Sequence, residues 1–318
     1  QKVVNSLGAD ILRLWIGSTD YSGEMTVSDE ILNRSADSYR RIRNTMRFML
    51  ANMEGFVPSK DLVDIDQMLV LDKWIVSKTA ELQKNVISEY DEYNFHFAMK
   101  AILNFCTNDL GGFYLDIIKD RQYTTQTDSL ARRSAQSALF HISHAMVRWL
   151  APILSFTAEE IWQFLPGSSN ESIFLQTWYE GLEAKFNNHS IDVSRDINNH
   201  LRKELEEMRR DKIIGSSLDA EVDIFCEDEN YQALLELKDE LRFVFITSDA
   251  KVHPLKDKPV NAKNIDNSLA ILVRKSDYEK CVRCWHHRPE IGQNISHEEL
   301  CSRCIENVTG DGETRIFA

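Results

Sequence analysis

Two Cys-x-x-Cys pairs near the C-terminus constrain the fold of this 318-residue chain more than any other feature. The first pair is Cys281 and Cys284, and the second is Cys301 and Cys304. A gap of two residues lets both thiolates of a tight turn face a common centre, and two such turns complete a tetrahedral set of four sulfurs. That set suits one structural Zn²⁺ ion, because four protein ligands leave no position for water or substrate. Two disulfides or free thiols are the alternative.

The composition, with 43% hydrophobic and 27% charged residues, is that of an ordinary globular protein. No apolar run reaches the length of a membrane span, and the N-terminus lacks the pattern of a signal peptide. The sequence begins without Met, so we expect a fragment of a longer polypeptide. Six cysteines, four of them in metal spacing, fit a reducing, cytoplasmic compartment, in which Cys106 and Cys226 would be buried thiols.

Apolar residues recur at helical spacing through the first half of the chain, which predicts a bundle of about five helices over residues 28–166. The expected helices cover about residues 28–52, 69–90, 95–119, 128–150 and a short segment that closes at 166. Gly111 and Gly112 indicate a break or a close approach within the third of them. Thr157 and Glu160 have the spacing of a capping box, with Thr157 as the N-cap of the short helix.

The second half of the chain changes pattern. We expect a helix over about 192–211, a strand over 220–226, a helix over 231–241 and buried strands over 242–246 and 269–273. The fold class is therefore mainly α, with a helical bundle, a small α+β module and a C-terminal zinc knuckle or ribbon. The expected domains are 1–27 as a linker, 28–166 as the bundle, 167–274 as the connector and 275–318 as the zinc-binding domain.

One helix face carries many arginines. Arg40, Arg43 and Arg47 recur on one side of the helix, opposite its apolar stripe, and Arg41 lies between them. A guanidinium donates paired hydrogen bonds to phosphate, so this face is a candidate contact for an RNA backbone. The alternative is a solvated face that pairs with acids of neighbouring helices. The sequence contains no phosphate loop, serine-hydrolase elbow or zinc-protease motif, so we find no candidate catalytic residue.

Two further groups mix cations with aromatic or amide side chains. The first group is Lys119, Arg121, Gln122, Tyr123, Arg132 and Arg133. It suits single-stranded RNA, whose exposed bases stack and form hydrogen bonds, although a helix C-terminus balanced by cations is the alternative. The second group flanks the first cysteine pair and consists of Arg283, Trp285 and Arg288. A Trp beside a zinc ligand either packs on the knuckle or stacks on a base, and the spacing alone favours packing.

Several segments resemble one family of enzymes. Leu150–Trp162 resembles the anticodon-binding helical domain of class I aminoacyl-tRNA synthetases for branched aliphatic amino acids. Asp37–Phe48, Phe113–Tyr123 and the ending Cys281–Glu313 are similar to bacterial isoleucyl-tRNA synthetases, whereas the bundle motif alone also fits the valyl type. Gly8–Trp15 resembles the stretch that follows the KMSKS loop of these enzymes.

The resemblance implies the C-terminal part of such an enzyme, a monomer that binds the anticodon stem and loop of isoleucine tRNA. The catalytic and editing domains would lie N-terminal to this sequence and would carry ATP binding and the attachment of isoleucine. The arginine face would contact the tRNA backbone, and the two other groups would approach the anticodon. A zinc-stapled scaffold for protein interaction is the alternative, and the net charge of −13 mildly favours it.

Overall fold

The computed structural model describes residues 2–182 and 186–318, and the chain divides into two compact units. The first unit comprises the chain up to Met68, Asp72–Leu115 and Arg133–Phe186, and the second comprises Leu69–Leu71, Asp116–Arg132 and Asn187–Ala318. Within the described residues, every helix is too short or too polar to cross a membrane. The division into four domains that the sequence suggested stays a prediction.

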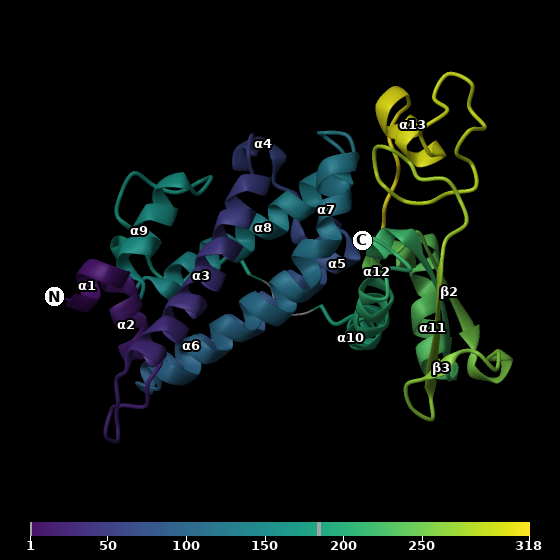
Figure 1. The fold of residues 1–318 in the computed structure, drawn as a ribbon. Helices are drawn as coiled ribbons and strands as arrows, with labels where there is room; N and C mark the ends of the chain where they lie inside the picture. Colours follow the sequence, from purple (N-terminus) through teal and green to yellow (C-terminus); the bar gives the residue numbers. More distant parts are fainter. Residues whose placement is uncertain (1, 183–185) are drawn as a thin grey trace. The chain divides into compact units, whose positions relative to one another are not determined.

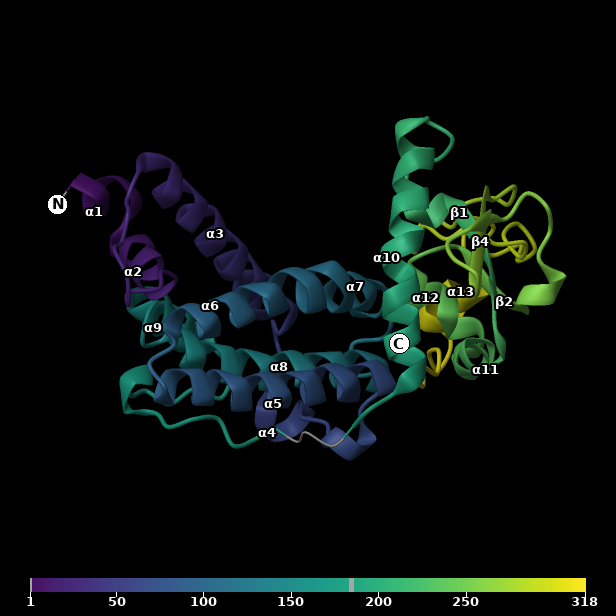
Figure 2. The ribbon, with the colours of Figure 1, turned by 90° about the horizontal axis from the view of Figure 1, so that it is seen from below.

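The first unit is a bundle of helices (Figure 1). Its helices are α1 (Lys2–Leu7), α2 (Ala9–Gly17), α3 (Asp29–Asn52), α4 (Pro58–Asp61), α5 (Val70–Asp91), α6 (Phe95–Asn104), the π-helix η2 (Phe105–Tyr114), α8 (Leu130–Leu150) and α9 (Ser155–Phe164). Short 3₁₀ turns, η1 (Ile65–Gln67) and η3 (Ile173–Leu175), complete it. Figure 2 shows α5 and α8 side by side. The long helices predicted from hydrophobic periodicity are confirmed, with end positions that differ by a few residues.

Large aromatic side chains fill the centre of this bundle. Trp74 of α5 meets Phe113 of η2 edge to face, with ring centroids 5.6 Å apart. Trp149 of α8 lies 6.4 Å from Phe105, and its indole N–H donates to the side-chain oxygen of Gln83 at 3.0 Å. The apolar stripes of α5, η2 and α8 therefore face one another, as amphipathic helices in a bundle must.

The predicted break at Gly111 and Gly112 is wrong, and the alternative, close packing there, stays a prediction. The backbone continues from α6 through ten residues of π-helix into α7 (Leu115–Thr124). A side chain at Gly111 would lie 3.0 Å from the backbone carbonyl oxygen of Cys106. This oxygen belongs to the same π-helix, five residues earlier, so a side chain at Gly111 would crowd the backbone of its own turn.

The predicted capping box at Thr157 is also wrong. Helix α9 begins at Ser155, two residues earlier. The backbone N–H and the hydroxyl of Thr157 both donate to the carboxylate of Asp10, at 2.7 and 2.6 Å. Glu160 does not reach back to the helix start, because it accepts two hydrogen bonds from Arg43. An acid from a distant segment therefore takes the capping role that the local motif suggested.

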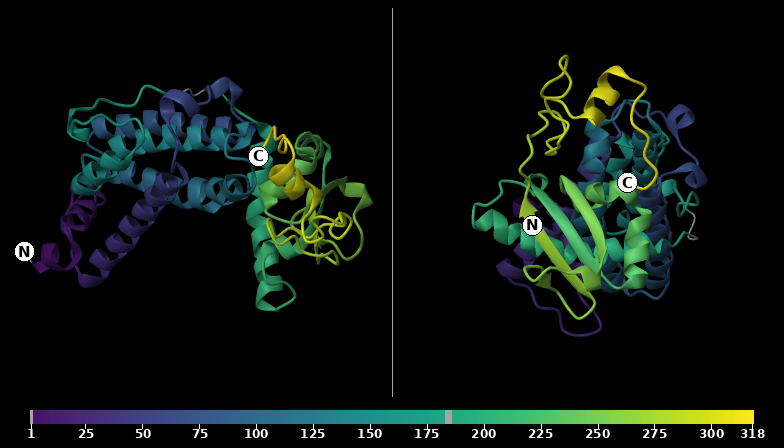
Figure 3. Two further views of the ribbon diagram at one scale, coloured as in Figure 1. Left: turned by 90° about the horizontal axis from the view of Figure 1, so that it is seen from above. Right: turned by 90° about the vertical axis from the view of Figure 1, so that its right-hand side faces the viewer.

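The second unit combines helices with a small mixed sheet. Its helices are α7, α10 (His189–Arg210), α11 (Asp228–Glu236), α12 (Leu241–Phe245) and α13 (Ser302–Thr309), with 3₁₀ turns η4 (Ser217–Asp219), η5 (Lys238–Glu240) and η6 (Leu255–Asp257). Its strands are β1 (Ala220–Cys226), β2 (Asp249–Pro254), β3 (Lys263–Asn264) and β4 (Leu269–Lys275), in the order β2-β1-β4-β3. β1 pairs in parallel with β2 and antiparallel with β4. Figure 3 shows the strands side by side as green arrows.

The prediction for residues 242–246 is wrong, whereas the strands predicted at 220–226 and 269–273 are confirmed. The apolar run forms α12, and Ile246 ends it in the left-handed conformation with φ 56°. A short buried run carries no alternation, so its sequence does not distinguish a strand from a buried helix. The parallel partner of β1 is instead β2, which is more polar and was not predicted.

Candidate functional site

The four cysteines of the two Cys-x-x-Cys pairs converge on one point. Their Sγ atoms all lie within 4.8 Å of one another, and all four side chains are buried. Cys281 and Cys284 flank a turn, whereas Cys301 precedes α13 and Cys304 lies in its first turn. The Sγ atoms of Cys284 and Cys301 are 3.6 Å apart, far beyond the roughly 2.05 Å of a disulfide.

Hydrogen bonds to sulfur support a thiolate centre. The backbone N–H of Cys301 donates to Sγ of Cys281 at 3.4 Å. Arg283 donates to Sγ of Cys304 at 3.7 Å and, from the same nitrogen, to the carbonyl oxygen of Thr124 at 2.6 Å. Such donors favour the thiolate form that binds metal. The donor set fits one structural Zn²⁺, which these four sulfurs would hold with no position left for substrate.

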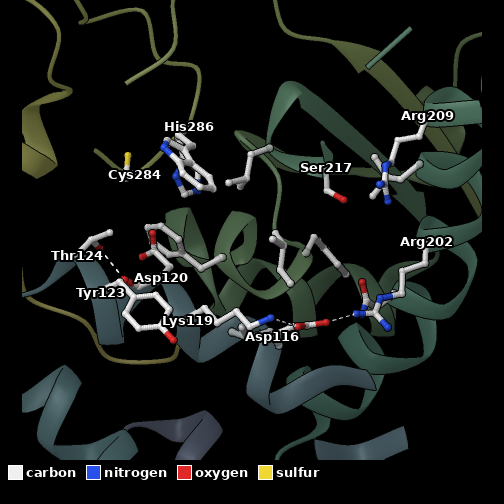
Figure 4. Close-up of a pocket in the computed structure, with 18 of the residues that line it drawn as sticks. Asp116, Lys119, Asp120, Tyr123, Thr124, Arg202, Arg209, Ser217, Cys284 and His286 are labelled. Carbon is white, nitrogen blue, oxygen red and sulfur yellow. Dashed lines mark hydrogen bonds and ion pairs between the residues drawn. The ribbon is translucent and has the colours of Figure 1, made fainter. Parts of the chain in front are cut away.

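A cavity of about 810 Å³ opens beside this centre, within the second unit. Figure 4 shows Lys119 and Tyr123 of α7 on one side, Arg202 and Arg209 of α10 on another, and His286 on a third. Apolar side chains also line it, namely Ile117, Leu205, Leu218, Phe243, Phe245 and Ile246. The cavity thus combines an apolar interior with several cations.

The cations of the cavity are only partly neutralised by acids. Asp116 accepts from Lys119 at 2.7 Å and from Arg202 at 2.9 Å, so one carboxylate serves two cations. Arg209 pairs with Glu206 at 3.1 Å. The three cationic side chains are 41–50% exposed. Exposed ion pairs contribute little to stability, so an anionic ligand could replace the acids of Arg202 and Arg209 at little cost.

Trp285 stands out among the aromatic residues of the cavity. Its backbone has φ 66°, in the left-handed region that favours glycine, and its side chain is 59% exposed. The ammonium nitrogen of Lys280 lies 5.5 Å from the ring centroid. Tyr123 is 64% exposed in the same cavity. The indole is therefore covered only in part, and whether it packs on the knuckle or stacks on a base stays a prediction.

A buried network of ions holds the wall of the cavity. Asp120 accepts two hydrogen bonds from Arg303, at 2.8 and 2.9 Å, and a third from Arg315 at 2.5 Å. Both arginines also donate to Glu313, and Arg315 lies 3.4 Å from the ring centroid of Phe243. Burial alone would raise the pKa of Asp120, but the two guanidinium groups outweigh it and hold that pKa well below its usual range.

The arginine face of α3 is exposed and partly paired. Arg43 makes a two-pronged pair with Glu160, at 2.7 and 2.9 Å, and Arg40 pairs with Asp37 at 2.8 Å. Two exposed arginines of this face have no ion-pair partner in the part of the chain that the structure describes: Arg41 and Arg47. The alternative of pairing with acids of neighbouring helices thus holds for Arg43 alone, because Arg40 pairs within its own helix.

The group on α7 separates into exposed and buried members. Lys119 and Tyr123 line the cavity. Arg121 and Gln122 are 0% and 3% exposed, and each donates to a backbone carbonyl at the start of α8 at 3.2 Å. Because both side chains are buried, we no longer expect Arg121 and Gln122 to contact RNA.

Of the three remaining predicted cations, two pair with acids and the third is partly buried. Arg133 pairs with Asp61 at 3.4 Å, and Arg132 is half-buried. Arg288 is 25% exposed and pairs with Glu290 at 3.4 Å. These three therefore have less free surface for a ligand than Arg41 or Arg47 of α3.

Some residues of the cavity were missed by the sequence analysis. Arg202 and Arg209 share a face of α10 with Leu205, and this spacing was visible in the sequence as a charged edge beside an apolar stripe. Asp120 and His286 carried no such signal. Their roles depend on partners more than 150 residues away or on burial, which local patterns do not reveal.

Two models of known domains match the chain in succession. Residues 72–224 match the anticodon-binding domain of tRNA ligase, and residues 279–307 match the zinc finger found in FPG and IleRS. The second match contains all four converging cysteines.

Curated relatives align with the whole chain. An isoleucine–tRNA ligase of Ruthia magnifica is 63% identical over 318 residues, and those of Vesicomyosocius okutanii and a Shewanella strain are 56% and 55% identical. All of this chain is covered, but only 34–37% of each relative, so the chain spans about a third of the relatives' length. The chain thus contains an anticodon-binding domain of the tRNA-ligase type followed by the zinc finger found in FPG and IleRS, and over its whole length it is similar to about a third of several isoleucine–tRNA ligases.

Proposed function

We propose that this region binds the anticodon stem and loop of isoleucine tRNA. The cavity beside the zinc centre carries the proposal. It joins two exposed aromatic side chains, Trp285 and Tyr123, with the cations of α7 and α10 around an apolar interior. Unstacked bases bind to such surfaces, since stacking on an aromatic ring and hydrogen bonding at the base edges supply most of the recognition of RNA loops.

The left-handed backbone of Trp285 supports a role for its side chain in ligand binding. A left-handed conformation costs an L-residue about 1–2 kcal/mol, and glycine would avoid that cost. The side chain is mostly exposed, so burial recovers only part of the cost. An indole held outward at a zinc knuckle is therefore better explained by a ligand than by packing.

Backbone phosphates would contact the exposed arginines. Arg41 and Arg47 are exposed without an acidic partner among the described residues. Arg40 and Arg43 could exchange their acids for phosphate, since exposed pairs contribute only ~0–1 kcal/mol. In this division of roles the phosphate contacts position the RNA and the cavity reads its bases.

The activity of the longer relatives is also a proposal for the protein that contains this chain. We infer that its remaining part attaches isoleucine to the tRNA with ATP and edits errors, while this region holds the anticodon. No residue of this region is assigned a catalytic role. A cytoplasmic location and a monomeric state belong to the same proposal.

The test is the affinity of the zinc-loaded chain for transcripts of isoleucine tRNA and valine tRNA, titrated with salt. We expect saturable binding that weakens as salt rises, because cations release counterions from phosphate, and a preference for isoleucine tRNA. Zinc is quantified in the same sample. Equal or absent binding by a chain that holds about one zinc would contradict the proposal and favour a scaffold for protein partners.

A further inference from the structure

His286 lines the cavity but is almost fully buried, with 3% of its surface exposed. Its ring packs edge to face against Phe243, with centroids 5.6 Å apart. Among the described residues neither ring nitrogen has a partner at hydrogen-bonding geometry, although the ring interacts with the thiol of Cys284 and the carboxylate of Asp120. A neutral imidazole has one donor and one acceptor nitrogen, so two hydrogen-bonding groups are left unsatisfied.

The other buried histidines of the described chain do not share this feature. His144 contacts the carbonyl oxygen of Pro166 at 2.9 Å through one ring nitrogen, and His141 contacts the hydroxyl of Tyr179 at 2.8 Å. Among the described residues, His286 is the one histidine with both ring nitrogens buried and unpartnered. Buried polar groups are nearly always paired in native proteins, so an exception at a cavity wall points to a missing ligand.

The surroundings define the chemistry of that ligand. Trp285, the next residue, offers a flat apolar surface, and Tyr123 offers a second one in the same cavity. Lys119 and Arg209 supply positive charge. A planar group with donors and acceptors along its edge, attached to an anionic backbone, satisfies all of these features. A nucleobase of single-stranded RNA is such a group.

We propose that His286 is a specificity-determining residue that reads the hydrogen-bonding edge of the RNA base entering this cavity. This inference rests on the proposed function and adds to it the residue that distinguishes one base from another. Stacking on aromatic rings tolerates every base, because all bases have a π-face. Discrimination needs a group with directional hydrogen bonds, which the imidazole provides at the cavity wall.

A role at the zinc centre is the competing explanation, since His286 follows Cys284 by two residues and its ring interacts with that thiol. An imidazole N–H that stabilised a cysteine thiolate would affect metal binding rather than RNA discrimination. The two roles are therefore separated by measuring zinc content and base discrimination on the same variants.

The experiment uses the zinc-loaded chain and RNA stem-loops with the isoleucine anticodon or with single-base changes in it. His286→Phe keeps the ring and its contact with Phe243 but removes both nitrogens. We expect it to lower the discrimination ratio about tenfold, the loss of one net hydrogen bond, with zinc content and the salt slope unchanged. His286→Gln keeps a donor and an acceptor and should recover part of the ratio.

Arg209→Ala is the matched control on the opposite wall. It should weaken all stem-loops alike, because a phosphate contact carries no base information. A His286→Phe chain that keeps its zinc and discriminates as wild type would overturn the inference, and so would one that loses its zinc. If the wild-type chain binds RNA without discriminating, the inference fails while RNA binding stands. If the wild type binds no RNA, the proposed function itself fails.

Discussion

Arginines have different surroundings in the two units of this molecule. On α3 of the first unit, Arg34 and Arg40 are 77% and 67% exposed and pair with acids about one turn away on the same helix. In the second unit, Arg303 and Arg315 are 10% and 2% exposed and share buried carboxylates beside Phe243. An exposed pair contributes about 0–1 kcal/mol, whereas breaking a buried pair costs about 3–5 kcal/mol.

Arginine content alone therefore does not identify a binding surface. The exposed arginines of α3 can exchange their partners for phosphate at little cost. The buried ones cannot, and they instead fix the wall of the cavity beside the zinc centre. We therefore expect changes to the buried ion network of the second unit to affect folding, and changes on α3 to affect only the strength of RNA binding.

Loss of the metal should have the largest effect. Cys301→Ser removes one sulfur of the four, and structural zinc supplies about 10–16 kcal/mol in isolated fingers. We expect the variant to lose its zinc and the segment 279–307 to become sensitive to protease. Cys106→Ser, which alters a buried thiol of the first unit, is the control and should keep about one zinc. A protease-resistant finger in zinc-free Cys301→Ser would refute the metal's structural role.

Asp120→Ala should have the second-largest effect on stability. It leaves Arg303 and Arg315 without their shared carboxylate, so we expect the free energy of unfolding to fall by about 3–5 kcal/mol. Urea denaturation with a probe in the second unit measures the change. Arg40→Ala removes an exposed pair and should cost less than about 1 kcal/mol. If both variants lost a similar free energy of unfolding, the buried and the exposed arginine pairs would not differ in their contribution to stability.

The same carboxylate predicts a pH dependence. The folded pKa of Asp120 is below the unfolded value of about 3.9. The ionised carboxylate therefore stabilises the fold fully above about pH 5, and this contribution declines as the pH falls below about 4. The stability difference between wild type and Asp120→Asn should shrink over that acid range. Asp277→Asn, at an exposed position, should show no such change. A difference that is independent of pH would contradict the buried ion pair.

Trp285→Gly separates stability from binding at a single position. Glycine adopts φ 66° without strain, so we expect no loss of thermal stability. Removal of the indole should weaken binding of anticodon stem-loops by about 1–3 kcal/mol, the usual contribution of one stacked base. Trp285→Phe keeps a ring and should lose less. If Trp285→Gly unfolds the finger but the residual folded chain binds RNA normally, the indole serves packing after all.

Arg41→Ala and Arg47→Ala should have the smallest effects. Each removes one exposed cation of α3, so the affinity for every stem-loop should fall alike and the salt slope should drop by about one. The melting temperature should not change, because neither side chain has an ion-pair partner among the described residues. A selective loss for one anticodon would assign base reading to α3 instead of the cavity.

Local patterns were sufficient for much of the fold and for the metal site. Helical periodicity gave α3, α5 and α8, and the spacing of Cys281, Cys284, Cys301 and Cys304 gave the zinc ligands, because both signals depend on residues close in sequence. The candidate RNA contacts were harder to predict. Tyr123 and Arg121 look equivalent in the sequence, yet one is 64% exposed and the other is buried.

Long-range contacts decided the features that the sequence analysis missed. The carboxylate of Asp10 replaced the expected cap of α9 across 147 residues, and Asp120 meets Arg315 across 195. Burial of Phe243, Val244 and Phe245 suits either a strand or a helix, so the sequence did not reveal that the run 242–246 is helical. The left-handed backbone of Trp285 follows from the tight turn around the cysteines, and no pattern of residue types encodes it.

Hydrogen exchange of the zinc-loaded chain, with and without the isoleucine anticodon stem-loop, tests the central claim most directly. We predict that RNA protects backbone amides that flank the cavity, at 117–124 of α7 and 281–287 of the zinc finger. A stem-loop with a changed anticodon should protect them less at equal occupancy. Protection confined to α3, or equal for both RNAs, would contradict the claim that the cavity beside the zinc centre reads the anticodon.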